Sequence, residues 1–344
     1  MGGVSGAGAA GQPRGAWPGQ AWRGAVRVVP FVVGLATRFR RVVERSGVLL
    51  EGPAGWGEFS PFPEYPPAVA AAWAAAAREA AEVGWPAPRR HAIPVNAIVP
   101  AVDPLEAHRI VTASGCATAK VKVAEPGESL AVDLARCEAV RDALGPAGAL
   151  RIDANAAWDP DTAVRAIGAL SRFGLEYVEQ PVADLADFAQ IRRKVDVPLA
   201  ADESIRTAVD PLAIAGFDGV DVIVLKVAPL GGVRRALAVA EAATARAPLD
   251  VVVSSAVETS VGLAAGAALA AALPALPYAC GLGTQALLTD DVTDTPCAPV
   301  RGQLTPTAVQ PDPARLAAAA PDPARAAALL ARFDAAEAAG GVSR

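Results

Sequence analysis

From about residue 93 onward, short apolar runs alternate with stretches of helical period, and this alternation constrains the fold of the chain more than any other feature. The apolar runs have the length and the flanking residues of buried strands, and the Ala/Leu/Arg-rich stretches between them are typical of helices. The predicted strands span residues 93–99, 119–123, 150–154, 176–180, 198–202, 221–226, 250–255 and 277–282.

The segments between these strands carry helix start signals, such as Asp159-Pro160 and Asp184. Strands and helices that alternate over about 190 residues favour a closed α/β barrel of the TIM type. An open doubly wound sheet is the alternative, but no glycine fingerprint follows the first strand. The predicted helices span residues 128–144, 160–173, 184–194, 231–246 and 258–272.

The two ends of the chain do not follow this rhythm. Residues 25–92 predict two or three strands and then an Ala-rich helix over 67–83, whereas residues 305–344 are rich in Ala and Pro and end in a helix near 322–338. We interpret the two flanks as one small α+β domain, with the C-terminal segment returning to pack on the N-terminal one. The barrel then spans 93–304. We interpret the Gly/Ala-rich residues 1–24 as a disordered extension, with a misassigned start as the alternative.

The composition excludes several classes of protein. A net charge of −5, no basic stripe and 5% aromatic residues argue against a nucleic-acid-binding protein. The uncharged run from Thr259 to Thr289 contains Pro274 and Pro277, so a packed helix followed by a strand fits it better than a membrane span. We expect a soluble, cytoplasmic protein with no membrane partner. Its oligomeric state stays open.

Charged residues stand at the C-terminal ends of the predicted strands, which is where TIM-type barrels carry their chemistry. Each interval between successive strand ends is about one βα unit, so the side chains would converge at one mouth. A solvated loop residue is the structural alternative for Asp153, and a loop start with a Ser204 helix cap is the alternative for Asp202. The residues in phase with the strand ends are Lys120, Lys122, Asp153, Glu179, Asp202 and Lys226.

Three buried carboxylates need a compensating cation, and oxygen ligands favour a hard one such as Mg²⁺. A zinc site would need His or Cys, and the only histidines, His91 and His108, lie away from the strand ends. Acid–base work then falls to lysine. Two ammonium groups roughly 7 Å apart on one strand face repel by about 2.5 kcal/mol at an effective dielectric constant of about 20. One of the two lysines, together with the metal, would thus make the other a usable base.

The order of several motifs resembles the enolase superfamily, in its muconate-lactonising subgroup with a lysine on each face of the site. The resemblance covers essentially the whole barrel. It implies a (β/α)₇β modified TIM barrel with an α+β capping domain formed by the N-terminal segment and the C-terminal tail. The motifs are "KVK", "RIDAN", "EYVEQP", "ADES" and "LKVAPLGG".

Three further segments are similar to the dehydratase branch of this subgroup: "GWGEFSPFPEY" (55–65), "SSAVETSVG" (254–262) and "GLGT" (281–284). That branch converts 2-succinyl-6-hydroxy-2,4-cyclohexadiene-1-carboxylate (SHCHC) to o-succinylbenzoate in menaquinone biosynthesis. The resemblance implies a small-molecule carboxylate substrate and a Mg²⁺ cofactor, with Mn²⁺ as a substitute. It also implies that the 55–65 loop folds over the mouth, although a packed hinge is the alternative.

The resemblance assigns roles residue by residue. Lys122 matches the base that removes the proton α to the carboxylate and then, as an acid, assists departure of hydroxide. Lys226 matches the lysine that supports the enediolate on the opposite face, and Lys120 matches a contact to the substrate carboxylate. The residues that match the metal ligands are Asp153, Glu179 and Asp202.

Further residues are candidates for substrate contact. Arg151 shares the strand face of Asp153, but a structural ion pair is the alternative; helix caps are the alternative for the two serines, and a turn for the glycine. The candidates are Asn155, Arg151, Ser254, Ser255 and Gly281.

Rival functions use the same lysines. N-succinylamino acid racemases and dipeptide epimerases need both Lys122 and Lys226 for proton transfer, one on each face. Dipeptide epimerases carry an acidic D-x-D after the last strand, where this chain reads "GLGTQ" (281–285). Muconate cycloisomerase fits the loops less well. A non-catalytic barrel is the remaining class, and the full set of carboxylates and lysines argues against it.

Overall fold

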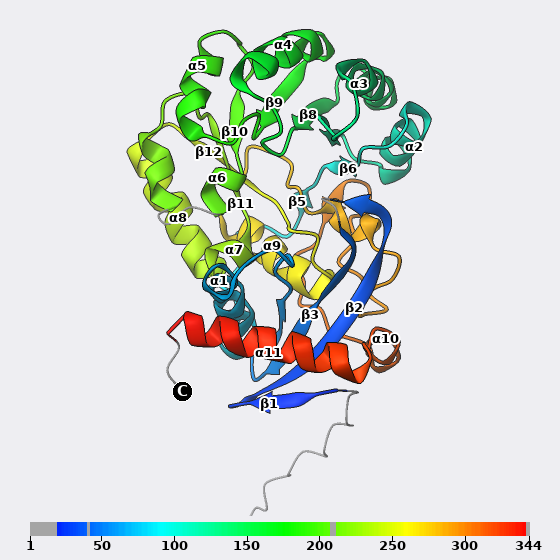
Figure 1. The fold of residues 1–344 in the computed structure, drawn as a ribbon, viewed down its shortest axis with the longest axis vertical. Coiled ribbons are helices and arrows are strands. Elements are labelled where there is room, and N and C mark those ends of the chain that lie inside the picture. Colours follow the sequence, from blue (N-terminus) through cyan, green and yellow to red (C-terminus); the bar gives the residue numbers. More distant parts are fainter. Residues whose placement is uncertain (1–18, 40–41, 207–210, 342–344) are drawn as a thin grey trace, which may run out of the picture.

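The computed structural model describes residues 19–39, 42–206 and 211–341. A parallel sheet of seven strands winds through the upper part of the molecule in Figure 1, with order β12-β11-β10-β9-β8-β7-β6 and helices on its outside. Each strand is only three to five residues long and is almost wholly buried, as expected for a sheet covered on both faces. The strands are β6 (Ala97–Val99), β7 (Thr118–Lys122), β8 (Ala149–Asp153), β9 (Leu175–Glu179), β10 (Leu199–Ala201), β11 (Val222–Leu225) and β12 (Asp250–Val253).

Residues 280 and 281 close this sheet. Gly281 N donates to Val253 O of β12 (2.8 Å), and Asn96 N, just before β6, donates to Cys280 O (3.0 Å). The eighth strand predicted over 277–282 is thus reduced to single parallel bridges, and the strand predicted over 93–99 divides into β5 (Ile93–Pro94) and β6. The predicted fold class, a modified TIM barrel with a capping domain, is confirmed.

The barrel helices begin where the sequence places capping residues. Asp103, Asp159 and Thr259 each accept a hydrogen bond from a backbone N–H of the following helix, and Pro104 and Pro160 occupy the first helical positions. The helices around the barrel are α2 (Pro104–Ser114), α3 (Leu130–Leu144), α4 (Pro160–Leu170), α5 (Phe188–Arg192), α6 (Glu203–Arg206), α7 (Val227–Leu230), α8 (Val233–Arg246) and α9 (Ser260–Ala272), with 3₁₀ turns η2 (Ser171–Phe173), η3 (Leu185–Asp187), η4 (Pro211–Gly216) and η5 (Gly283–Leu287).

The capping domain is a four-stranded antiparallel sheet, β1-β2-β3-β4, packed on α1 (Pro67–Arg78) and its one-turn π-helical extension η1 (Glu79–Val83). The sheet lies close to α1: a Cβ on Gly57 would stand 2.1 Å from the Ala77 carbonyl oxygen, so only glycine fits there. The long β2–β3 hairpin rises along the barrel toward its mouth (Figure 1). The strands are β1 (Ala21–Arg23), β2 (Val26–Phe39), β3 (Val42–Gly52) and β4 (Gly55–Phe59).

The C-terminal segment lies against this sheet. After β13 (Gln303–Leu304) pairs with β5, helices α10 (Pro313–Ala318) and α11 (Pro323–Ala339) follow, and α11 crosses the front of the capping domain in Figure 1. Phe333 of α11 packs edge-to-face on Phe59, with 5.1 Å between ring centroids. Of the extension predicted over 1–24, residues 1–18 lie outside the described residues, whereas Ala21–Arg23 are ordered as β1 on β2.

None of the helices in the described ranges combines the length and the apolarity needed to cross a membrane. The run from 259 to 289 forms α9 and the closing segment of the barrel. All four cysteines are buried free thiols.

Candidate functional site

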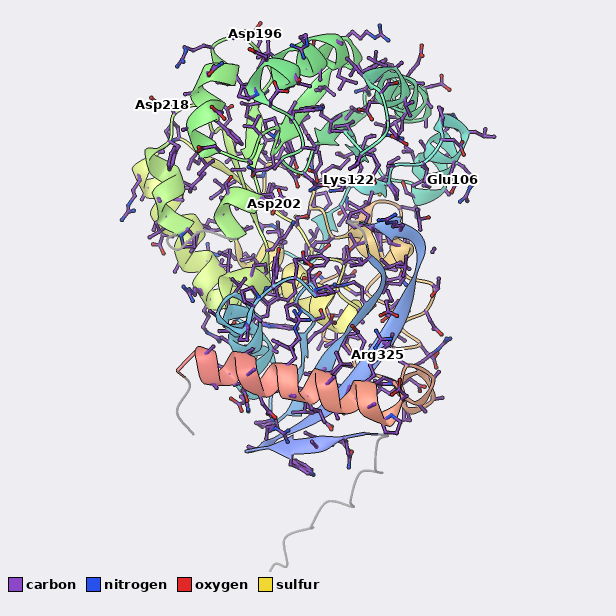
Figure 2. The ribbon with its side chains drawn as sticks, viewed as in Figure 1. Glu106, Lys122, Asp196, Asp202, Asp218 and Arg325 are labelled. Atoms are coloured by element: carbon purple, nitrogen blue, oxygen red, sulfur yellow. The ribbon has the colours of Figure 1, made fainter. Side chains whose placement is uncertain are left out.

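Six charged side chains form a ring at the C-terminal ends of β7 to β11. They are Lys120, Lys122, Asp153, Glu179, Asp202 and Lys226. In the parallel ladder Lys122 stands opposite Asp153, and Asp153 stands opposite Glu179. Asp202 follows β10 directly, and Lys226 follows β11 as the first residue outside α7. Figure 2 shows Lys122 and Asp202 in the interior of the molecule, whereas Glu106, Asp196 and Asp218 lie at its edge. The predicted convergence of charges at one mouth is therefore what the fold produces.

Each lysine of the ring is paired with a carboxylate. Lys120 Nζ lies 2.7 Å from both oxygens of Glu179 and 3.6 Å from Asp153 Oδ2. Lys226 Nζ donates to Asp202 Oδ2 at 2.6 Å. Lys122 Nζ donates to Asp153 Oδ2 and to Asn155 Oδ1 (2.7 Å). The three carboxylates are at most 1% exposed, so their charges are balanced by ammonium groups rather than by water.

The carboxylates also interact with one another. Burial raises the pKa of Glu179, and the charges of Asp153 and Asp202 raise it further, against the opposing effect of Lys120. For Lys120, burial lowers the pKa, but Glu179 and Asp153 more than offset burial and leave the pKa raised. The repulsion between Lys120 and Lys122 is therefore opposed by the carboxylates that face the two lysines. With the carboxylates paired as in this structure, the ammonium form of Lys120 is stabilised.

The donor set suits a hard divalent cation. Asp153, Glu179 and Asp202 supply oxygen atoms from adjacent strands, and their mutual repulsion is what a bound cation would relieve. In the described part of the chain no three His, Cys, Asp or Glu side chains are arranged as a formed metal site. The ammonium groups of Lys120 and Lys226 lie against the carboxylate oxygens instead.

Two cavities lead to the ring. The inner one, about 20 Å³, is lined by Lys120, Lys122, Asp153 and Lys226 of the ring. The outer one, about 490 Å³, opens between the β2–β3 hairpin and the barrel and is also bounded by Lys122. Phe39 and Phe62, like Lys122, line both cavities, so the capping domain contributes two aromatic side chains to the surroundings of the charged ring.

The segment after β12 forms one wall of the inner cavity. Ser254 and Ser255 line the cavity, and their hydroxyl groups donate to the Gly281 carbonyl at 3.4 and 3.1 Å. Ser255 Oγ is also 2.7 Å from Thr284 Oγ1. A Cβ at 281 would lie 2.4 Å from Ser254 Oγ, so a larger residue there would displace the Ser254 hydroxyl. The structure thus places the two serines in the cavity wall and uses Gly281 to hold them.

The remaining two candidates occupy different depths of the barrel. Asn155 lines the outer cavity and bridges Lys122 and Glu203, to which its Nδ2 donates at 3.0 Å. Arg151 is fully buried nearer the other end of the barrel: its Nε donates to Glu176, and its guanidinium lies 4.7 Å from the ring centroid of Tyr177. For Arg151 the structure therefore shows the ion pair that the sequence left open.

Several cavity-lining residues were not found by sequence reasoning. Phe39 comes from the end of β2, and Lys122 Nζ lies 5.0 Å from its ring centroid. Phe62 belongs to the loop that was expected to fold over the mouth, and it does reach both cavities. Thr284 follows the closing segment. The contribution of the capping domain depends on how two domains dock, and local sequence patterns carry little signal for docking.

The family models agree with this division into two domains. Residues 30–81 match the family described as enolase N-terminal domain-like, and residues 105–312 match the enolase C-terminal domain-like family. The chain therefore belongs to the enolase superfamily.

Within that superfamily, the chain is 63% identical over 287 residues to an o-succinylbenzoate synthase of Thermobifida fusca, with 83% of this chain and 89% of the relative covered. It is 51% identical over 286 residues to an o-succinylbenzoate synthase of Mycobacterium ulcerans, with 83% and 85% covered. The chain is thus a member of the o-succinylbenzoate synthase family.

Solved structures support the fold. The L-Ala-D/L-Glu epimerase from Bacillus subtilis superimposes with a TM-score of 0.71 at 24% identity, covering 81% of this chain and 95% of that one. A muconate cycloisomerase from Pseudomonas fluorescens gives 0.71 at 23% identity, covering 84% and 97%. At these identities the likeness concerns architecture alone.

Proposed function

We propose that this protein is an o-succinylbenzoate synthase that dehydrates SHCHC to o-succinylbenzoate in menaquinone biosynthesis, in the cytoplasm. The observation that carries the proposal is the 63% identity to a relative of that name, over 83% of this chain. The ring of three lysines and three carboxylates fits the proposed chemistry. Its charges balance as they are paired in this structure, and a divalent cation held by the carboxylates would leave a net positive charge for an anionic substrate.

Asp153, Glu179 and Asp202 would hold a Mg²⁺ ion, with Mn²⁺ as a substitute. When bound, the ion would supply positive charge that stabilises the enediolate and favours the neutral form of the nearby lysines. This assignment rests on the donor type and on the mutual repulsion of the three buried carboxylates.

Lys122 is the proposed base. Its Nζ, as a neutral amine, takes the proton α to the substrate carboxylate, and the electron pair of the C–H bond passes into the enediolate. The resulting ammonium then donates that proton to the departing hydroxyl group on the same face, so that water leaves and the ring becomes aromatic. Asn155 Oδ1, which accepts from Lys122 Nζ at 2.7 Å, orients the amine.

Lys226 and Lys120 act electrostatically. Lys226 is buried and lines the inner cavity, where its ammonium group supports the negative charge that develops in the substrate. Lys120 keeps positive charge beside the substrate carboxylate. Ser254 and Ser255 line the same cavity and offer hydroxyl groups to the succinyl arm.

The test is turnover of SHCHC, followed by the loss of its diene absorbance with Mg²⁺ present and with EDTA as the control. Lys122→Ala and Lys226→Ala should each abolish dehydration and leave the far-UV circular dichroism spectrum unchanged. Lys194→Ala, at a half-exposed barrel lysine paired with Asp161, should keep full activity. A fully active Lys122→Ala protein would refute the mechanism.

A parallel reaction with an N-succinylamino acid in D₂O separates the racemase alternative. Exchange of the α-proton without dehydration of SHCHC would leave the proposed roles of the lysines and the metal intact, but it would show that the protein is a racemase. The relatives at 63% and 51% identity carry the synthase name, which favours dehydration with little exchange.

A further inference from the structure

Val257 has a backbone conformation that β-branched residues rarely adopt. It lies between β12 and α9, lines the inner cavity and has φ +61°, in the left-handed region that favours glycine or asparagine. A strained residue of this kind persists only where its surroundings over-determine it, and such residues gather at functional sites. The contacts that hold Val257 therefore bear on the site.

Arg45 of the capping domain holds this residue. Its Nε donates to the Val257 carbonyl at 3.1 Å, and its Nη2 donates to the carbonyl of Ser60. The guanidinium carbon lies 4.3 Å from the ring centroid of Phe62. One side chain of β3 thus contacts two walls of the inner cavity, since Val257 and Phe62 both line it.

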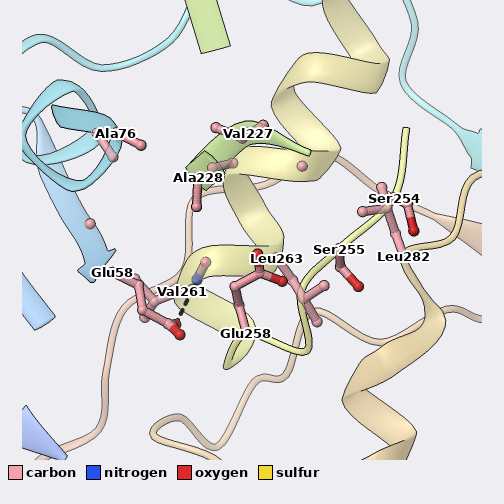
Figure 3. Close-up of a pocket in the computed structure, with 15 residues that line it drawn as sticks. Glu58, Ala76, Val227, Ala228, Ser254, Ser255, Glu258, Val261, Leu263 and Leu282 are labelled. Atoms are coloured by element: carbon pink, nitrogen blue, oxygen red, sulfur yellow. Dashed lines mark hydrogen bonds between the residues drawn. The ribbon is translucent and has the colours of Figure 1, made fainter. Parts of the chain in front are cut away.

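The other side of the loop is held by carboxylates. Glu258 Oε2 accepts from Ala256 N at 2.7 Å, and Glu58 of β4 accepts from the amides of Thr259 (3.1 Å) and Gly262 (3.0 Å). Figure 3 shows Glu58 reaching the first turn of α9, with Glu258 between it and Ser255. The capping domain therefore holds this loop at two points, the Val257 carbonyl and the Thr259 amide.

The position of Arg45 is costly, which argues against an incidental contact. The side chain is 1% exposed, and burial lowers its pKa, with Glu258 and Glu58 acting in the opposite direction. Burying a guanidinium group is unfavourable unless hydrogen bonds and nearby charges compensate for the lost water. Here the hydrogen bonds go to the backbone carbonyls of Val257 and of Ser60, in the 55–65 loop.

We propose that Arg45 is a positioning residue for the dehydration: by holding Val257 and Phe62, it keeps the walls of the inner cavity in the conformation that accepts the substrate. This inference rests on the proposed function. Without the clamp the loop would occupy the competent conformation for a smaller fraction of the time. The apparent affinity falls by that fraction, whereas the rate at saturation is preserved.

The experiment is a double-mutant cycle on turnover of SHCHC. Arg45→Met should raise KM by roughly tenfold and change kcat by less than about threefold. Val257→Gly makes φ +61° accessible without strain, so in the Val257→Gly background the effect of Arg45→Met on KM should shrink by at least about threefold. Arg141→Met is the matched control. Arg141 also donates to loop carbonyls, those of Phe173, Gly145 and Gly148, away from the site, and its loss should leave KM unchanged.

Hydrogen exchange of peptides over 254–262 gives a second readout that does not need activity. Arg45→Met should accelerate exchange there, and Val257→Gly should reduce that acceleration. If Arg45→Met yields little folded protein, Arg45→Lys takes its place, because one ammonium can reach only one of the two carbonyls and should give a smaller change of the same kind.

An unchanged KM, an equal effect in both backgrounds, or unaltered exchange over 254–262 would overturn the role of Arg45. A wild-type protein that does not dehydrate SHCHC would instead overturn the proposed function. In that case the exchange measurements would still decide whether Arg45 clamps the loop.

Discussion

Glu58→Gln should remove a pH dependence of stability that a buried carboxylate imposes on the wild-type protein. Glu58 lies in β4 at the contact between the capping domain and α9 and is 6% exposed. Burial is the main reason that its pKa is raised to about 7 from the usual 4.5, and the nearby Glu258 raises it further. The folded protein therefore binds this proton more tightly than the unfolded chain does.

The sign and size follow from proton linkage. Between pH 4.5 and about 7 the folded state holds the proton while the unfolded chain has released it, so stability falls as pH rises. The contribution is fully present below pH 4.5 and is lost above pH 7. The difference between a pKa of 4.5 in the unfolded chain and about 7 in the folded protein corresponds to about 3 kcal/mol of unfolding free energy.

Glutamine can keep the hydrogen bonds of Glu58. Glu58 Oε2 accepts from Thr259 N, Thr259 Oγ1 and Gly262 N, whereas Oε1 accepts from the Ser60 hydroxyl at 2.6 Å. A glutamine with Oε1 toward α9 and Nε2 toward Ser60 reproduces this pattern, because a hydroxyl also accepts. The substitution therefore removes the charge with little other change.

The assay is urea unfolding at pH 5 and pH 8. The wild type should lose stability relative to Glu58→Gln over this interval, by up to about 3 kcal/mol. Glu138→Gln, at an exposed position of α3, is the control and should follow the wild type. Other buried carboxylates affect the pH dependence of the unfolding free energy equally in the wild type and in Glu58→Gln. Their effects therefore cancel when the two proteins are compared. Wild-type and Glu58→Gln stabilities that run parallel between the two pH values would refute the reasoning.

Three further predictions concern the metal and the capping domain. EDTA should abolish turnover of SHCHC, and added Mg²⁺ should restore it with no change in far-UV circular dichroism; activity that survives complete chelation would contradict the metal assignment. Phe333→Ala should lower the free energy of unfolding by about 3–5 kcal/mol, since the fully buried ring packs on Phe59, and a loss below about 1 kcal/mol in urea unfolding would show that α11 is dispensable. Glu79→Ala removes the acceptor for the Val233 amide (2.5 Å) at the start of α8 and should cost about 1 kcal/mol in the same assay, whereas Glu82→Ala, at a half-exposed ion pair, should cost less.

The sequence predicted the barrel and its charged ring because both depend on local patterns. Strand ends recur at regular intervals, and the C-terminal ends of parallel strands meet on one face, so Asp153, Glu179 and Asp202 could be placed together without coordinates. The closing strand was harder to predict. Pro277 and Gly281 lie in it, and the structure keeps only the bridges at 280 and 281.

The alternation of side chains along a strand did not predict how far along the barrel axis each inward-facing side chain lies. Arg151 and Asp153 do share one face of β8, yet Arg151 pairs with Glu176 near the start of β9, whereas Asp153 pairs with Lys122 at the mouth. A period of two assigns a side chain to the inside of a barrel, but it does not assign a layer. The carboxylates that face Lys120 and Lys122 were likewise not part of the two-lysine prediction, because their pairing depends on how neighbouring strands dock.

Several non-glycine residues that follow strands of the barrel have a left-handed backbone conformation, with a positive φ. Asn155, Gln180 and Val257 have φ of 46°, 39° and 61°, and each follows a strand that carries site residues. Glycine would avoid a cost of order 1–3 kcal/mol at each position. The side chains of Asn155 and Gln180, however, have tasks that glycine could not perform, whereas Val257 is held through its backbone carbonyl.

Gln180 is the clearest case. Its Oε1 accepts from the amide of Asp202 at 2.9 Å, and its Nε2 donates to Ser204 Oγ at 2.6 Å, so the end of β9 fixes the end of β10. Asn155 similarly orients Lys122. The strained backbone turns the chain away from the sheet directly after the functional residue, while the side chain at the turn holds a functional residue of the neighbouring strand. Gln180→Gly should therefore relieve the backbone strain and yet lower kcat/KM, because Asp202 would lose the hydrogen bond that sets its position; unchanged turnover would show that the strain serves folding alone.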